Sequence, residues 1–123
     1  MLNTALASLR HTIQDHITED IMDIVYGERW LQIWVPKQYK GLGLSFKEGL
    51  AVLRQLANLD GSLGWMVTLC AGANYFSRNL LPHIAFDLFQ HQRTCFGGSG
   101  MIGGTAEKTT DGYRINGLEI CYR

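Results

Sequence analysis

The chain has 123 residues, of which 46% are apolar and 18% are charged, a composition typical of a globular domain. Eleven basic and eleven acidic residues give zero net charge, which excludes nucleic acid or an anionic membrane as a partner held by long-range electrostatics. We see no secretory signal pattern and no apolar stretch of membrane-spanning length, so we expect a cytoplasmic protein.

Three cysteines, Cys70, Cys95 and Cys121, are too far apart in sequence to indicate a disulfide framework or a zinc site, and we expect reduced thiols. His11 and His16 lie near acidic residues, but the two side chains face different ways on a helix. We therefore expect a solvated polar face there and no metal site.

Apolar residues recur at steps of three or four along the first segment, which predicts one amphipathic helix from Asn3 or Thr4 to about Gly27. These residues are Leu2, Leu6, Leu9, Ile13, Ile17, Ile21, Ile24 and Val25. A short helical turn over 28–34 should end at Pro36, because the residue before proline avoids the helical region.

Ser45 and Glu48 have the spacing of a capping box and predict a helix that ends near Asn58 to Asp60. Asp60 or Ser62 should cap the next helix, over 63–81, which is apolar on nearly all sides and therefore typical of the middle of a bundle. Pro82 should either end it or open a further helix, which should run over about 83–90.

After Gln92 the pattern becomes strand-like. Segment 94–96 resembles the start of a strand, residues 97–104 are rich in glycine, and 105–109 reads as a strand. Asp111-Gly112 is a strong hairpin signal. We therefore predict a mainly α fold with a helical domain over 1–92 and the incomplete start of a β domain over 93–123.

The glycines at 98, 100 and 103 match the dinucleotide pattern G-x-G-x-x-G, with Glu119 as a candidate ribose ligand. A strand follows them, whereas that mechanism needs a helix N-terminus beneath the phosphates, so a glycine-rich linker is the favoured interpretation. Ser62 and Ser99 have no evident His and acid partners for nucleophilic hydrolysis. Glu48 is better explained as a capping residue than as a general base.

Several phrases, in order, resemble the acyl-CoA dehydrogenase-like flavoprotein superfamily. The run from Val35 to Ser45 resembles its P-x-x-Y-G-G-x-G loop, with Lys40 in place of the first glycine. The run from Gln55 to Trp65 is similar to its E-L-A-x-x-D-x-S helix junction, and Ser-Leu-Gly-Trp is similar to the two-component flavin monooxygenase branch. The runs 98–100, 104–108 and 111–117 resemble the first hairpin of its middle β domain.

The resemblance implies a helical N-terminal domain of the acyl-CoA dehydrogenase type, followed by a truncated β hairpin, in a FAD- or FMN-dependent oxidoreductase. Members of the superfamily are much longer and carry a C-terminal helical bundle. The chain is therefore expected to be inactive alone and not to retain flavin. The expected partners are a small-molecule substrate and, in a homo-oligomer, further copies of the chain.

The same resemblance suggests site residues. Phe96, Gly98 and Ser99 stand where the superfamily approaches its flavin, although the Thr-Glu pair of dehydrogenases is missing. Asn74 stands where some monooxygenases carry an oxygen-activating histidine, and Trp65 and Asn74 are the candidates for a substrate-pocket wall. No catalytic residue is assigned.

One alternative is a non-enzymatic, dimerising or partner-binding helical module, for which Trp30, Trp34 and the unpaired strands are expected to supply exposed surface. The other is a stand-alone nucleotide binder that uses the glycine-rich stretch.

Overall fold

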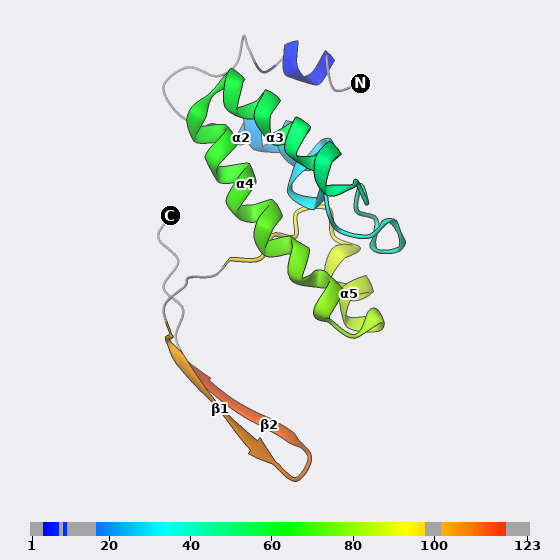
Figure 1. Ribbon diagram of the computed structural model, residues 1–123, viewed down its shortest axis with the longest axis vertical. Helices are drawn as coiled ribbons and strands as arrows, with labels where there is room; N and C mark the ends of the chain where they lie inside the picture. Colours follow the sequence, from blue (N-terminus) through cyan, green and yellow to red (C-terminus); the bar gives the residue numbers. More distant parts are fainter. Residues whose placement is uncertain (1–3, 8, 10–16, 98–101, 118–123) are drawn as a thin grey trace.

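The chain folds into a mainly helical body followed by an antiparallel hairpin, as predicted for the fold class (Figure 1). The computed structural model describes residues 4–7, 9, 17–97 and 102–117, of which 4–7 and 9 are helical. The further elements are α2 (Glu19–Gly27), η1 (Trp30–Gln32), η2 (Lys37–Tyr39), α3 (Phe46–Leu59), α4 (Gly61–Tyr75), η3 (Phe76–Asn79), α5 (Pro82–Phe89), β1 (Gly104–Thr109) and β2 (Gly112–Gly117).

The boundaries of α3 and α4 follow from side-chain caps. The Ser45 hydroxyl accepts the Glu48 N–H at 3.3 Å, and the Glu48 carboxylate accepts the Ser45 N–H at 2.8 Å, which completes the predicted capping box. The Asp60 carboxylate accepts the Leu63 N–H at 2.8 Å and opens α4. These contacts satisfy backbone donors that the first turn of a helix leaves unpaired.

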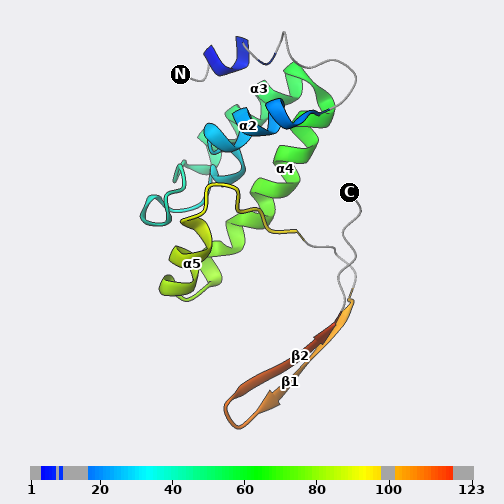
Figure 2. The same ribbon diagram turned by 180° about the vertical axis from the view of Figure 1, so that it is seen from behind.

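Helices α3 and α4 run side by side in both views of the ribbon (Figures 1 and 2). Their backbones approach most closely at Gly64, where an added Cβ would lie 2.5 Å from Cα of Ala57. A glycine is therefore required at this crossing, because any side chain would push the two helices apart.

The main hydrophobic core lies between α2, the segment around η1, α3 and α4. Its buried members are Leu9, Ile21, Val25, Trp30, Leu31, Ile33, Trp34, Val52, Leu53, Leu56, Leu63, Val67 and Ala71. A second, smaller cluster joins α5 to the segment around η2 through Val35, Tyr39, Ala85 and Phe89. The protein therefore packs its helices around two adjacent apolar clusters.

The prediction of one continuous first helix is wrong. Ile17 and Thr18 are not helical, and Thr18 has extended backbone angles (φ −92°, ψ 169°) before α2 begins at Glu19. Leu9 and Ile21 are both buried in the same core cluster. The apolar spacing therefore continues across the break, because the segments on both sides pack on one core.

The prediction that α4 is buried on all sides is also wrong for the described residues. One side carries the buried Leu63 and Val67, while Trp65 is 66% exposed and Leu69 is 54% exposed. The helix ends at Tyr75 and continues as η3, so the predicted helix over 63–81 is shorter than expected. Apolar residues on every face of α4 therefore did not mean that the helix is surrounded by other helices.

Segment 94–96 is not a strand, contrary to prediction. Its backbone is paired with a side chain of α4, described below, instead of a neighbouring strand. The hairpin follows, with Thr109 opposite Gly112 and Thr110-Asp111 forming the turn, one residue earlier than the Asp-Gly signal suggests. All side chains of β1 and β2 are exposed.

Two glycine substitutions test the packing of α3 and α4. At Gly49 an added Cβ would lie 2.2 Å from Nε1 of Trp34, whereas at Gly72 it would meet no atom within 4 Å. Gly49→Ala should lower the free energy of unfolding by about 1–2 kcal/mol, because overpacking outweighs the gain in helix propensity.

Gly72→Ala is the matched control and should raise the free energy of unfolding by about 0.5–1 kcal/mol through helix propensity alone. Urea unfolding followed by circular dichroism measures both changes. Equal effects at the two positions would contradict the packing described for Trp34.

Candidate functional site

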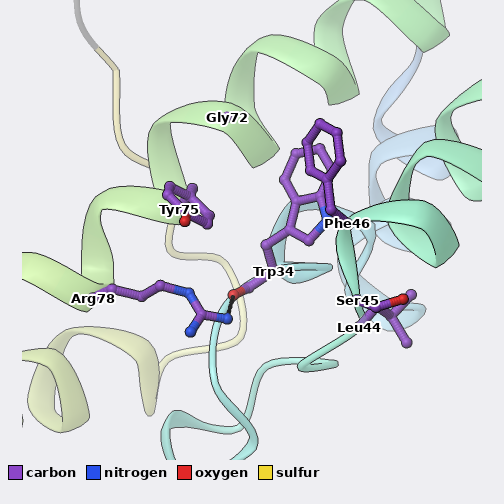
Figure 3. A pocket seen from close by; sticks show the side chains of 7 residues that line it. All are labelled: Trp34, Leu44, Ser45, Phe46, Gly72, Tyr75 and Arg78. Carbon is purple, nitrogen blue, oxygen red and sulfur yellow. Dashed lines mark hydrogen bonds between the residues drawn. The ribbon is translucent and has the colours of Figure 1, made fainter.

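A cavity of about 650 Å³ lies between the C-terminal half of α4 and the segment that leads into α3 (Figure 3). This volume is within the range of small-molecule sites, about 300–1,000 Å³. The residues that line the cavity are Trp34, Leu44, Ser45, Phe46, Gly72, Tyr75 and Arg78.

Aromatic rings form one wall of this cavity. The rings of Trp34 and Phe46 are stacked, with centroids 5.5 Å apart and planes inclined by 21°. Trp34 is buried in the core, whereas Phe46 is 67% exposed, so the stack extends from the core to the surface. Tyr75, which is 49% exposed, contributes a third ring from α4.

Arg78 is the charged residue among those lining the cavity. Its Nη2 donates to the Trp34 carbonyl oxygen at 3.0 Å, and its Cζ lies 5.4 Å from the centroid of the Tyr75 ring. These two contacts orient the guanidinium at one end of the cavity (Figure 3). Its planar fork has five N–H donors, so most remain after the bond to Trp34.

Ser45 lines the cavity away from Arg78 (Figure 3), and it bonds to Glu48, which is not among the described lining residues. The Ser45 hydroxyl donates to the Glu48 carboxylate at 2.6 Å. Hydrogen bonds from the Ser45 hydroxyl and backbone N–H lower the pKa of Glu48. The carboxylate is therefore held ionised as part of the helix cap, which agrees with its interpretation as a capping residue instead of a general base.

Asn74 lies in the interior of the protein and is not among the residues that line the cavity. Its side chain is fully buried, and its Nδ2 donates to the Leu31 carbonyl at 2.8 Å and to the Thr94 carbonyl at 3.4 Å. Its Oδ1 accepts the Phe96 N–H at 2.8 Å. One carboxamide thus joins α4, η1 and the segment after α5, in a junction that we call the Asn74 junction.

Cys70 and Cys95 meet beside this junction, and both are partly exposed. A hydrogen bond from the Cys95 thiol lowers the pKa of Cys70 to about 7, and the same bond raises the pKa of Cys95. The Cys95 sulfur also lies 3.4 Å from the Phe96 carbonyl oxygen. A thiolate is a stronger hydrogen-bond acceptor than the Phe96 carbonyl oxygen. When Cys70 ionises, the Cys95 S–H therefore donates to the Cys70 sulfur.

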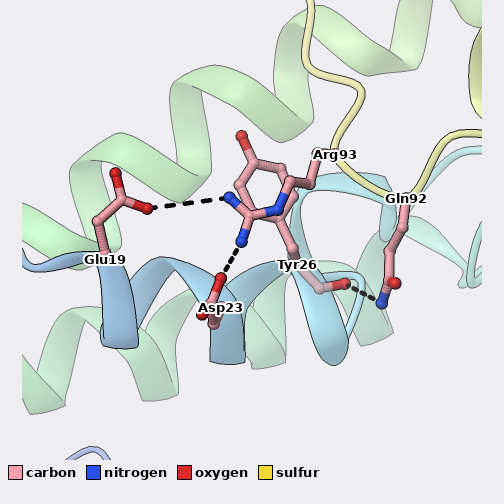
Figure 4. A network of polar contacts seen from close by, with 5 residues as sticks. All are labelled: Glu19, Asp23, Tyr26, Gln92 and Arg93. Carbon is pink, nitrogen blue, oxygen red and sulfur yellow. Dashed lines mark hydrogen bonds and ion pairs between the residues drawn. The ribbon is translucent and has the colours of Figure 1, made fainter.

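A polar network fixes the segment after α5 to α2 (Figure 4). The Arg93 guanidinium pairs with Asp23, lies 3.9 Å from a Glu19 oxygen and stands 5.2 Å from the centroid of the Tyr26 ring. Gln92 Nε2 donates to the Tyr26 carbonyl at 3.1 Å. Each exposed contact is weak, but together they direct the chain toward the Asn74 junction.

The candidate residues from the sequence do not form one cluster. Trp65 is exposed on α4 and Asn74 is buried in its junction, and neither lines the cavity. The Phe96 ring packs against Phe89, with centroids 5.1 Å apart. Gly98 and Ser99 lie outside the described residues, as do His11, His16 and Glu119. The roles of Phe96, Gly98, Ser99, Trp65 and Asn74 toward flavin or substrate remain predictions.

Sequence reasoning missed the cavity and its arginine. Gly72, Tyr75 and Arg78 are three residues apart, a spacing that places them along one face of α4 and η3. This spacing was readable from the sequence. The position of the Trp34–Phe46 stack beside this face could not be predicted, because those residues come from a different part of the chain.

The part of the chain that the structure describes has neither a metal cluster nor a membrane-spanning helix. No three His, Cys, Asp or Glu side chains there gather closely enough to hold a metal ion. No helix among the described residues has both the length and the apolar character needed to cross a membrane.

Comparison with known proteins gives one partial similarity. The chain is 28% identical over 104 residues to the indole-3-acetate monooxygenase of Pseudomonas putida. The match covers 85% of this chain and 27% of that protein, so the chain spans about a quarter of the relative's length. No protein family model and no solved structure matches the chain. A monooxygenase is one kind of oxidoreductase, so this similarity agrees with the class of enzyme expected from the ordered sequence phrases.

The Asn74 junction predicts a large effect of a small substitution. Asn74→Ala removes the side-chain carboxamide, both its NH2 group and its oxygen. The Leu31 carbonyl and the Phe96 N–H then lose this partner. We expect the free energy of unfolding to fall by about 2–4 kcal/mol, measured by urea titration.

The control is Asn58→Ala on the exposed face of α3, which should change the free energy of unfolding by less than about 0.5 kcal/mol. Hydrogen exchange at the Phe96 amide should accelerate in Asn74→Ala alone. An unchanged Phe96 exchange rate would show that the junction does not hold this segment.

The thiol pair predicts a pH-dependent reactivity. Alkylation of Cys70 by iodoacetamide should reach half of its maximal rate near pH 7, because the thiolate is the nucleophile. In Cys95→Ala the midpoint should rise toward about 8.5, the ordinary thiol value. Mass spectrometry of the Cys70 peptide measures both profiles, and identical midpoints would refute the hydrogen bond between the thiols.

Proposed function

We propose that this chain is the helical N-terminal portion of a flavin-dependent oxidoreductase of the acyl-CoA dehydrogenase-like type, on the flavin monooxygenase side of that superfamily. The observation that carries this proposal is the 104-residue similarity to a monooxygenase. The ordered sequence phrases from Val35 to Gly117 agree with it. The mainly helical body followed by a hairpin is compatible with it.

In this proposal the chain supplies support for a cofactor site and not the reaction itself. The bound FAD or FMN would supply the redox chemistry. The Asn74 junction would fix Phe96 and the start of the glycine-rich segment, where Phe96, Gly98 and Ser99 are the proposed cofactor contacts. Asn74 and Trp65 are proposed to wall the substrate pocket of the complete enzyme.

The described residues do not by themselves make a flavin site. Phe96 already uses its N–H on Asn74 and packs its ring on Phe89. Phe96 is not among the described residues that line the cavity. We therefore propose that this chain alone neither retains flavin nor turns over substrate.

A specific observation favours a second candidate function, a dimerising or partner-binding helical module. The expectation that Trp30 and Trp34 supply its exposed surface is wrong, because both are buried in the core. Other large apolar side chains are exposed along α4 and η3, including Trp65, Leu69 and Phe76. An exposed apolar patch of this kind is typical of an interface. Light scattering across a range of protein concentrations distinguishes this function, because a monomer at high concentration would exclude self-association through this face.

The proposed function is tested by a chimera in which this chain replaces the matching region of the Pseudomonas putida enzyme. We expect the chimera to bind flavin and consume indole-3-acetate, whereas the chain alone should do neither. In the chimera, Asn74→Ala should weaken flavin binding and Asn58→Ala should not, because only Asn74 holds Phe96.

Flavin absorbance after gel filtration and indole-3-acetate consumption are the two measurements. A chimera that unfolds cooperatively but lacks both activities would contradict the oxidoreductase assignment. Flavin bound to the isolated chain would contradict the statement that this portion is insufficient alone.

A further inference from the structure

We propose that the cavity between α4 and the segment leading into α3 is a binding site for a planar aromatic carboxylate. The Arg78 guanidinium would pair with the carboxylate, and the rings of Trp34, Phe46 and Tyr75 would surround the aromatic group. Among the described residues, the lining of the cavity does not include Trp65, Asn74 or Phe96, which the sequence predicts to approach flavin or substrate.

The aromatic part of the ligand follows from the walls. The Trp34–Phe46 stack and the Tyr75 ring leave apolar faces open to the cavity, since Phe46 and Tyr75 are both about half exposed or more. Aromatic rings bind one another in stacked or edge-to-face geometry and gain energy beyond simple burial. A flat ring is therefore the group that these walls accommodate best.

The shape of the cavity depends on a missing side chain. Gly72 lines the cavity from α4, and a Cβ added there would meet no atom within 4 Å. The space in front of Gly72 is therefore open at the position of a Cβ, and a larger side chain there would extend into the cavity. This provides a way to remove the site while keeping the fold.

The charge of the ligand follows from Arg78. Its guanidinium is oriented in advance by the Trp34 carbonyl oxygen and the Tyr75 ring, with unused N–H donors remaining. Guanidinium and carboxylate match as parallel forks, so a prearranged arginine favours a carboxylate over a neutral group.

The two ends of the cavity also determine the direction of the ligand. Away from Arg78, the cavity is lined by Ser45, whose hydroxyl and N–H bond the negatively charged Glu48 carboxylate behind it. An anion is repelled from that end and attracted to the other. The carboxylate should therefore face Arg78, with its ring toward Phe46.

The inference does not depend on the proposed oxidoreductase function, because it concerns equilibrium binding by this chain alone. The test uses naphthalene-1-acetate as the probe and naphthalene-1-acetamide as its neutral counterpart of nearly the same shape. Isothermal titration calorimetry gives the dissociation constants, and ¹H–¹⁵N chemical shifts identify the amides that move.

Wild-type protein should bind naphthalene-1-acetate about five- to tenfold more tightly than the amide, with shifts centred on Gly72, Tyr75 and Arg78. Arg78→Gln should remove this preference and leave binding of the amide unchanged. Gly72→Leu should abolish binding of both compounds. Arg54→Gln on the exposed face of α3 is the control and should behave as wild type.

Equal affinity for the two compounds, or an unchanged preference in Arg78→Gln, would overturn the carboxylate assignment. Binding that survives in a folded Gly72→Leu variant, or no binding at several millimolar probe, would overturn the site itself. Dispersed amide spectra confirm that each variant is folded. A chimera that fails while the probe still binds would reject only the oxidoreductase proposal.

Discussion

The buried carboxamide of Asn74 is the interaction on which the arrangement of this protein depends. It pairs backbone groups of Leu31, Thr94 and Phe96, which belong to segments far apart in sequence. A buried amide is costly unless it is satisfied, so these segments must meet at one place. The same pairing turns the next residue, Tyr75, toward the cavity and brings the thiol of Cys95 to Cys70.

The two sides of α4 consequently have different roles. Its inner side contributes Leu63, Val67 and Asn74 to the core and the junction, whereas Trp65 and Leu69 remain exposed. In an isolated chain this exposure has a cost in solubility. The same apolar surface is what a longer oxidoreductase or a second copy of the chain would cover, so the two candidate functions explain one observation differently.

Local signals in the sequence predicted the elements well where short-range chemistry decides. The sequence predicted the Ser45–Glu48 capping box, the Asp60 cap and the presence of the hairpin, whose turn lies one residue earlier than the Asp-Gly signal. Tertiary contacts decided the rest: Thr18 breaks a helix that the apolar spacing appeared to continue, and segment 94–96 pairs with Asn74 instead of a strand. The cavity could not be predicted, because its arginine and its aromatic stack meet only after α4 packs beside α3.

Asp60 has a consequence for how the chain folds. This single residue ends α3 through its N–H bond to Leu56 and begins α4 through its bond to Leu63, so no loop separates the two helices. Closing such a short connection costs little chain entropy, and contacts close in sequence form quickly. We therefore expect the α3–α4 pair to form before the distant segment 92–97 docks. Slow steps in folding should arise from that docking and from the non-local contacts it makes.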